Sequence, residues 1–205
     1  MLFLTLLACY ERVLTDARID VRKEVVHVLS QQQGVDDQIE GAACTDVAGC
    51  LAALTNHLAE ERSQLAAMAA TDIVNGFYLR DGELDLVVAY TAPLSSELFA
   101  GGAPLQRVAA EVNGKQRVFA VVRQPLPDEN ARMTVSATGP HARLSLAEDG
   151  DLWTFTRGRP RVHLTYQNVR DGVDLVIDPW IQNIPGLEAA LRADPRFLDP
   201  AGLRP

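Results

Sequence analysis

The sequence predicts an α+β protein in which a long N-terminal helix and a second helix precede an antiparallel β-meander. Two observations predict this class. Apolar residues recur every three or four positions as far as about residue 70, which is the spacing of an amphipathic helix. Beyond Asn75-Gly76 the apolar residues become β-branched or aromatic, and turn dipeptides recur at short intervals. We therefore expect an apolar and amphipathic helix over residues 1–33, followed by one α+β globular domain over residues 34–205.

The first eight residues, Met1 to Ala8, read MLFLTLLA, and only Thr5 is polar. A helix of that length spans about 12 Å at ~1.5 Å per residue, whereas a bilayer core needs about 30 Å. The segment also lacks the basic start of a secretory signal. Three interpretations remain open: the apolar start of a buried helix, the end of a longer membrane anchor, or a short lipoprotein-like signal ending at Leu6-Leu7-Ala8-Cys9.

The pattern continues over residues 10–30, where charged residues fill the positions between the apolar ones, and it favours one helix over residues 3–30. The apolar positions are Tyr10, Val13, Leu14, Ala17, Val21, Val25, Val28 and Leu29. In outline this helix resembles the spine of type IV pilin-like subunits and the entry helix of membrane-anchored sensor domains, although Thr5 stands where most pilins carry glutamate. The resemblance implies an extracytoplasmic domain that is tethered or assembled through its N-terminal helix.

A second helix is expected over residues 46–70, because Thr45 can cap its N-terminus and Asp46 lies in its first turn. Its apolar stripe consists of Val47, Leu51, Leu54, Leu58, Leu65 and Met68. Asp81-Gly82 and Asn113-Gly114 each separate two strand-like segments, which is the pattern of a β-hairpin. We expect no helix longer than two turns between residues 77 and 178.

The C-terminal tail is expected to be mostly loop. Five of the 11 prolines lie at Pro179 or later, and proline interrupts regular structure. One short helix fits between these prolines, near residues 187–192.

Charge and motif content exclude several function classes. The chain has 19 Lys and Arg against 27 Asp and Glu, and its net charge of -8 has the wrong sign for neutralising nucleic-acid phosphates. Nucleic acid is therefore not an expected partner. The sequence contains no metal-finger spacing, P-loop, GxGxxG or HExxH motif, so we expect no cofactor and no metal. The 47% hydrophobic content is typical of an ordinary folded protein.

The three cysteines, Cys9, Cys44 and Cys50, are too few for a disulfide framework. Cys44 and Cys50 are close enough in sequence to form a small disulfide in an oxidising compartment. Alternatively, Cys50 lies on the buried stripe of the second helix as an inert thiol. If that helix instead begins near Gly49, Cys50 lies in its first turn, where the helix dipole lowers the thiol pKa and favours a reactive thiolate. The sequence leaves these three interpretations open.

Residues 161–180 are expected to fold as a hairpin symmetric about Arg170 and Asp171, which places His163 opposite Asp178. The same register gathers four apolar residues on the other face of the hairpin: Leu164, Tyr166, Leu175 and Ile177. A carboxylate beside a His is the orienting half of a nucleophilic triad, because it holds the tautomer and stabilises the imidazolium. The pair is also compatible with a structural ion pair on a sheet surface.

His163 and Ile177-Asp178-Pro179 resemble, in order and spacing, the cysteine-triad superfamily of papain-like enzymes, transglutaminases and protein-glutamine deamidases. In that superfamily the strand carrying the His leads through a turn to a strand ending in a sequence such as Ile-Asp-Pro. The resemblance covers residues 161–180 and implies a nucleophilic Cys that opens a helix upstream. Cys50, after Gly49, is the candidate, although it lies much farther before His163 than those families usually allow.

Two functions follow as expectations. The first is an extracytoplasmic binding or assembly domain whose partner is another protein or a second copy, with a membrane contact through residues 1–9 as an alternative. The second is a thiol-dependent acyl-transfer or amide-hydrolysing enzyme, or a degenerate relative, with Cys50 as nucleophile, His163 as base and Asp178 as orienter. A disulfide between Cys44 and Cys50 would exclude the second function, because it consumes the nucleophile.

Overall fold

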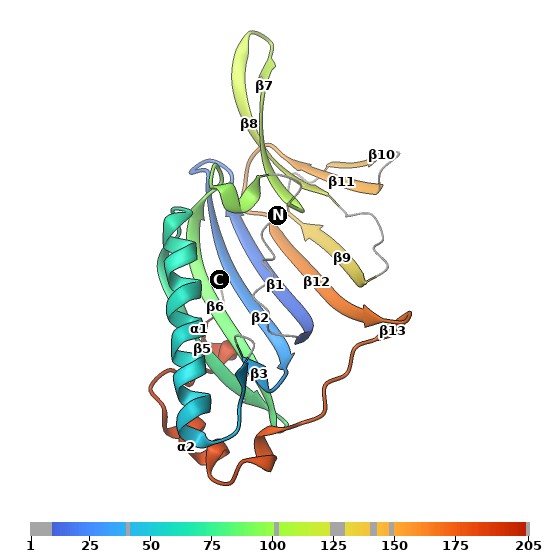
Figure 1. Ribbon diagram of the computed structural model, residues 1–205. Coiled ribbons are helices and arrows are strands. Elements are labelled where there is room, and N and C mark those ends of the chain that lie inside the picture. The colour runs from blue at the N-terminus through green and yellow to red at the C-terminus, as the bar shows by residue number, and fades with distance from the viewer. Residues whose placement is uncertain are drawn as a thin grey trace.

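The computed structural model describes residues 10–39, 42–100, 103–123, 130–139, 143–147 and 150–203. A large antiparallel sheet has the strand order β13-β12-β1-β2-β6-β5, and β9 pairs with β12 (Figure 1). Its strands are β1 (Tyr10–Asp20), β2 (Val25–Val35), β5 (Thr71–Arg80), β6 (Glu83–Pro93), β9 (Ala131–Thr138), β12 (Arg161–Arg170) and β13 (Val173–Asp174).

A smaller sheet and two helices complete the described fold. The small sheet has the order β10-β11-β8-β7 and consists of β7 (Leu105–Val112), β8 (Lys115–Arg123), β10 (Arg143–Ala147) and β11 (Gly150–Phe155). The helices are α1 (Val47–Ala67) and α2 (Leu187–Ala193), and β3 (Gln38–Ile39) pairs with β4 (Ala42–Ala43) before α1. Three-residue 3₁₀ helices occur at Glu97–Phe99, Ile181–Asn183 and Pro200–Gly202.

The predicted α+β class with a long N-terminal helix is wrong, because the described chain is mainly antiparallel β-sheet. Residues 10–35 form β1 and β2, which pair from Tyr10↔Val35 to Asp20↔Val25. Val13, Ala17 and Ile19 are buried, and their spacing fits the two-residue period of a strand as well as part of a helical stripe. The turn between the strands contains no Gly, Pro or Asn; instead Glu24 adopts a positive φ of 53°. Its one local signal is Asp20, whose carboxylate accepts a hydrogen bond from the Lys23 N–H at 3.1 Å.

Local predictions after residue 45 agree better with the structure. Helix α1 begins at Val47, and its cap is Asp46 instead of the predicted Thr45, because the Asp46 carboxylate accepts a hydrogen bond from the Gly49 N–H at 2.8 Å. The predicted turns Asp81-Gly82 and Asn113-Gly114 connect β5 to β6 and β7 to β8. Within the described part of residues 77–178, the 3₁₀ helix at 97–99 is the only helical element.

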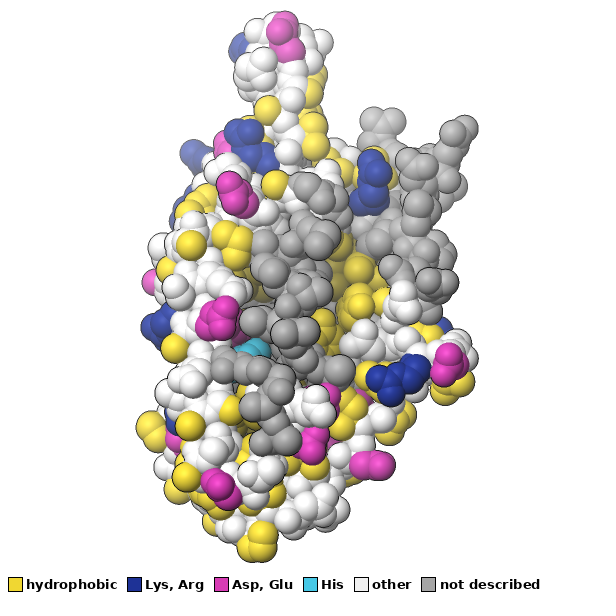
Figure 2. Space-filling view, viewed as in Figure 1, with side chains coloured by type: hydrophobic (Ala, Val, Ile, Leu, Met, Phe, Trp, Pro, Cys, Tyr) yellow, Lys and Arg dark blue, Asp and Glu magenta, His cyan; other side chains and the backbone are white. Residues whose placement is uncertain are grey.

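Helix α1 packs against one face of the large sheet, which we call the inner face, and it lies over β5 and β6 (Figure 1). A core cluster under α1 contains Cys50, Leu54, Phe77, Trp180 and Leu187, so the C-terminal segment closes this end of the molecule. A second core cluster runs along the inner face of β1, β2, β6 and β12 and continues into the small sheet. Figure 2 shows hydrophobic side chains gathered over β9 and β12, away from α1.

Candidate ligand-binding site

The sequence-predicted nucleophile is not a free thiol. Cys50 is fully buried on α1 and forms a disulfide with Cys44, with Cα atoms 5.0 Å apart. A sulfur in a disulfide has no thiolate to attack a carbonyl carbon. Cys9 lies outside the described residues, as does the membrane contact expected through residues 1–9.

The predicted register of His163 and Asp178 is also wrong. The turn closes at Asp171-Gly172, and β13 pairs with β12 only through Val169↔Asp174 and Arg170↔Val173. At His163, strand β12 already pairs with two strands: Asp16 of β1 lies on one side and Ser136 of β9 on the other. No third strand can therefore pair with β12 at this position. Asp178 follows β13 in the loop that leads to Trp180, so it is not a strand neighbour of His163.

His163 instead contacts a carboxylate that is distant in sequence. Its Nδ1 is hydrogen-bonded to Asp16 Oδ1, and both side chains are about half exposed. Residue alternation places this pair on the face of the sheet opposite α1, whereas Cys50 lies beneath α1. The structure therefore does not bring Cys50, His163 and Asp178 together, and the His163–Asp16 contact is a solvated surface pair.

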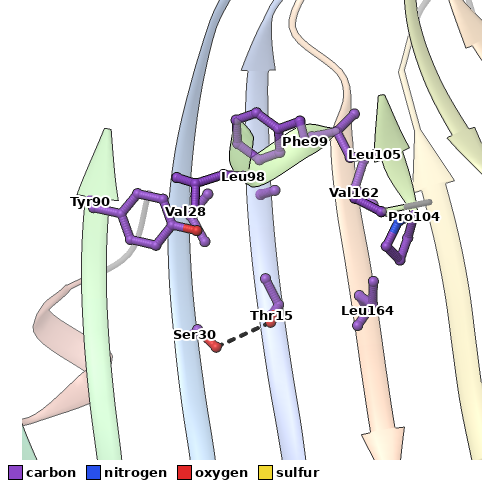
Figure 3. Close-up of a pocket in the computed structure, with 12 residues that line it drawn as sticks. Thr15, Val28, Ser30, Tyr90, Leu98, Phe99, Pro104, Leu105, Val162 and Leu164 are labelled. Atoms are coloured by element: carbon purple, nitrogen blue, oxygen red, sulfur yellow. Dashed lines mark hydrogen bonds between the residues drawn. The ribbon is translucent and has the colours of Figure 1, made fainter. Parts of the chain in front are cut away.

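The inner face carries a different candidate, a cavity of about 80 Å³ shown in Figure 3. Strands β1, β2, β6 and β12 form its floor, and Leu98, Phe99 and residues 103–105 form its rim. Its lining residues are Thr15, Ala17, Val28, Ser30, Tyr90, Leu98, Phe99, Ala103, Pro104, Leu105, Val162 and Leu164.

Strand register explains why these residues meet. One row across the inner face reads Leu164, Thr15 and Ser30, and the adjacent row reads Val162, Ala17, Val28 and Tyr90. Every member points to the same side because side chains alternate along each strand. Ala17 is the smallest side chain in its row and lies between two valines. Its short side chain leaves room that a larger residue at this position would fill.

The rim is held in place by a cap and by contacts to the β1–β2 turn. Ser96 caps the 3₁₀ helix by accepting a hydrogen bond from the Leu98 N–H at 3.2 Å. Leu98 and Phe99 are buried against the sheet. The Arg107 guanidinium contacts the Glu24 carboxylate at 2.8 Å, and the Leu94 N–H donates to the Glu24 carbonyl at 2.7 Å. These contacts position the rim over the cavity before any ligand binds.

Three hydroxyl groups are the polar side-chain groups that the described residues contribute to the lining. The Thr15 and Ser30 hydroxyl oxygens are 3.2 Å apart and share a hydrogen bond. Figure 3 shows the Tyr90 hydroxyl directed toward Val28, and no described residue hydrogen-bonds to it. Burial raises the pKa of Tyr90, with a smaller contribution from the Glu61 carboxylate, so the phenol stays protonated. Among the described residues, the lining contains no Lys, Arg, His, Asp or Glu.

The sequence patterns do not indicate this site. The predicted helix over residues 3–30 includes Thr15, Ala17, Val28 and Ser30, and it would separate Thr15 from Ser30 by about four turns. The available signal was the alternation of Val13, Thr15, Ala17 and Ile19, which fits a strand. The other apolar residues of this segment have the spacing of a helix, so the local sequence does not discriminate between a strand and a helix.

Comparisons with known proteins assign no family. No protein-family model, no curated protein and no solved structure matches the chain. In the described part of the chain, no helix is both long and apolar enough to cross a membrane. The same residues contain no group of three or more His, Cys, Asp and Glu side chains that could hold a metal ion.

Proposed function

We propose that this chain is an extracytoplasmic binding domain that holds an apolar ligand on the inner face of its large sheet. The observation that carries this proposal is the apolar cavity between the sheet and the rim formed by Leu98, Phe99 and residues 103–105. Small-molecule sites are typically concave and apolar, with a few polar groups that orient the ligand. The lining has that composition, and its volume of about 80 Å³ limits the buried part of the ligand to a small group such as one ring. Apolar ligand surface that enters the cavity gains about 25 cal/mol per Å² removed from water.

The disulfide between Cys44 and Cys50 supports the extracytoplasmic part of the proposal. Structural disulfides persist in oxidising compartments and are rare in the reducing cytosol. The bond also weighs against the thiol-dependent enzyme, because it removes Cys50 as a nucleophile. The assembly role expected through an N-terminal helix loses its structural basis, because residues 10–35 are strands in the interior of the sheet.

Binding of a neutral apolar fluorophore such as phenylnaphthylamine tests this function. The variant Ala103→Phe places a large side chain at the rim of the cavity, and Ala100→Phe makes the same change outside the lining. We expect saturable fluorescence enhancement by the unaltered protein, about tenfold weaker affinity in Ala103→Phe, and unchanged affinity in Ala100→Phe. Absence of saturable binding, or equal affinity of both variants and the unaltered protein, would contradict the proposal.

A further inference from the structure

The β7–β8 hairpin carries an open sheet edge. Strand β7 is the last strand of the small sheet, and among the described residues it pairs with β8 alone. Its outer part extends beyond the body of the molecule (Figure 1). A two-stranded ribbon is only marginally stable in water, and an open strand edge is a template for pairing with another strand. The outer edge of β7 is therefore a candidate interaction surface.

The hairpin turn fixes which backbone groups of β7 face this edge. Both residues of the Asn113-Gly114 turn have positive φ, as in a two-residue type I′ turn, so the closing pair Val112↔Lys115 is hydrogen-bonded within the hairpin. Pro104 continues the same alternation, because its carbonyl accepts a hydrogen bond from the Arg123 N–H at 2.7 Å. The intervening residues of β7 therefore direct their backbone N–H and C=O groups outward: Leu105, Arg107, Ala109 and Glu111.

These outward-facing residues complement a second copy of themselves. When two β7 strands pair antiparallel about Ala109, Arg107 of each copy lies opposite Glu111 of the other, on the same face of the sheet. The two ion pairs are related by a twofold axis, which is the self-complementarity that a symmetric dimer requires. Among the described residues, Glu111 has no ion pair within its own chain, so its carboxylate is available for this contact.

The same register joins the apolar residues on the other face of the ribbon. Val108 lies opposite Ala110 of the second copy, and Val108 is 39% exposed in the single chain. Phe119 of β8 is the neighbour of Val108 across the hairpin, so it extends this apolar surface. Pairing about Ala109 therefore covers an exposed apolar side chain while it forms the two ion pairs.

We propose that two copies of this chain associate through β7, which pairs antiparallel about Ala109 and joins the two small sheets into one. The backbone groups of Arg107, Ala109 and Glu111 form the hydrogen bonds between the copies. The Arg107–Glu111 pairs select this register, because a shift by two residues in either direction loses both of them. Residues 107–111 lie outside the cavity lining, so this inference does not rest on the proposed ligand.

Sedimentation velocity of the full chain between about 1 µM and about 1 mM tests this proposal, because small transient interfaces dissociate in this range. We expect a dimer whose population rises with concentration. Ala109→Pro removes an outward N–H and keeps the bonds to β8, since proline is tolerated at an edge position that faces away from the neighbouring strand. The dissociation constant of this variant should rise at least about tenfold.

Two opposite charge reversals test the register. Arg107→Glu and Glu111→Arg each place like charges opposite one another, so each variant alone should dimerise at least about tenfold more weakly. In an equimolar mixture every pair again joins opposite charges, and dimers should form as they do in the unaltered protein. Arg107 also contacts Glu24, but the mixture contains the same loss, so its recovery reports the contact between chains. Arg117→Glu reverses a charge on β8, away from the edge, and as the matched control should leave dimerisation unchanged.

The outcomes decide between this interface and any other. A monomer at every concentration would overturn the proposal, and so would dimerisation that Ala109→Pro leaves unchanged. A mixture of the two charge variants that associates no better than either variant alone would overturn the register and with it the interface. The mixture also keeps the test decisive if Ala109→Pro disturbs the hairpin, because it recovers only what each copy supplies to the other.

Discussion

At the scale of single residues, buried polar groups show where this fold depends on one side chain. The Asp85 carboxylate is completely buried and accepts three hydrogen bonds. The donors are Gln31 Nε2 at 2.9 Å, the Gly34 N–H at 3.0 Å and Arg80 Nε at 3.2 Å. Burial raises the pKa of Asp85, and these donors oppose the rise. The carboxylate thereby connects the end of β2 to the β5–β6 hairpin.

We predict that Asp85→Ala lowers the free energy of unfolding by about 2–4 kcal/mol, because it leaves the Gly34 N–H and Arg80 without their acceptor. Urea denaturation measures this change. Asp174→Ala removes a carboxylate that contacts Arg132 on the surface, with both side chains well exposed. That control should cost less than about 1 kcal/mol. Similar losses in the two variants would show that the Asp85 network is not important for stability.

His57 is buried on α1, and its Nε2 has no hydrogen-bond partner among the described residues. Burial lowers the pKa of His57 below its ordinary value of 6.5, with a small opposing effect from Glu60. The unfolded state therefore binds the proton more tightly than the folded state. The stability that neutral His57 contributes is present above pH 6.5 and is lost as the pH falls below it toward the folded-state pKa.

We predict that His57→Leu reduces the loss of stability between pH 7.5 and pH 5.5, because leucine cannot take up a proton. The measurement is urea denaturation of both proteins at these two pH values.

His27 is exposed on the outer side of β2, so His27→Leu should retain the pH dependence of the unaltered protein. The pKa of Glu61 is raised by burial and acts with the opposite sign. Comparing the variant with the unaltered protein isolates the His57 contribution. An identical pH dependence in the two would contradict this prediction.

At the scale of elements, the C-terminal segment protects an edge of the large sheet. Phe77 of β5 bonds to it on both sides: its N–H donates to the Arg196 carbonyl at 3.1 Å, and its carbonyl accepts from the Leu198 N–H at 2.9 Å. This contact is a parallel bridge between Phe77 and Phe197. An unpaired edge strand exposes backbone groups that can pair with another chain, and this segment covers part of that edge.

We predict that Gly76→Ala detaches this segment, because the added Cβ would overlap the carbonyl oxygen of Arg196. The expected result is a loss of about 1–3 kcal/mol in unfolding free energy and faster proteolytic cleavage after residue 180. Gly49→Ala, in the first turn of α1, serves as the control, since its Cβ would meet only Asp46 at ordinary contact distance. Protease resistance unchanged in Gly76→Ala would show that the segment is not held by this contact.

At the scale of the whole molecule, the β7–β8 hairpin extends beyond the body, while the cavity lies on the inner face (Figure 1). The base of the hairpin belongs to the core through Leu105, Ala120 and Val122. Its outer part, around Asn113-Gly114, contributes no residue to the core clusters or to the cavity lining. Stability and ligand binding should therefore be independent of the outer hairpin.

We predict that deleting residues 110–111 together with 116–117 changes the unfolding free energy by less than about 1 kcal/mol and leaves fluorophore affinity unchanged. The deletion removes two facing pairs, Ala110↔Arg117 and Glu111↔Gln116, so the turn and the side-chain alternation are preserved. Thermal unfolding and fluorophore titration measure both quantities. A tenfold weaker affinity would show that the outer hairpin takes part in binding.

The sequence by itself determined the features whose causes are local. Helix α1 follows from its stripe and its capping region, two hairpin turns follow from Asp-Gly and Asn-Gly, and α2 follows from the gap between prolines. Only the tertiary structure decided the partners of strands β1 and β12. Asp16 meets His163, and Thr15 meets Leu164, through pairings whose partners lie far apart in the chain. A strand buries its apolar side chains only when its neighbours are in place, so β1 and the cavity both depend on residues that local sequence patterns do not connect.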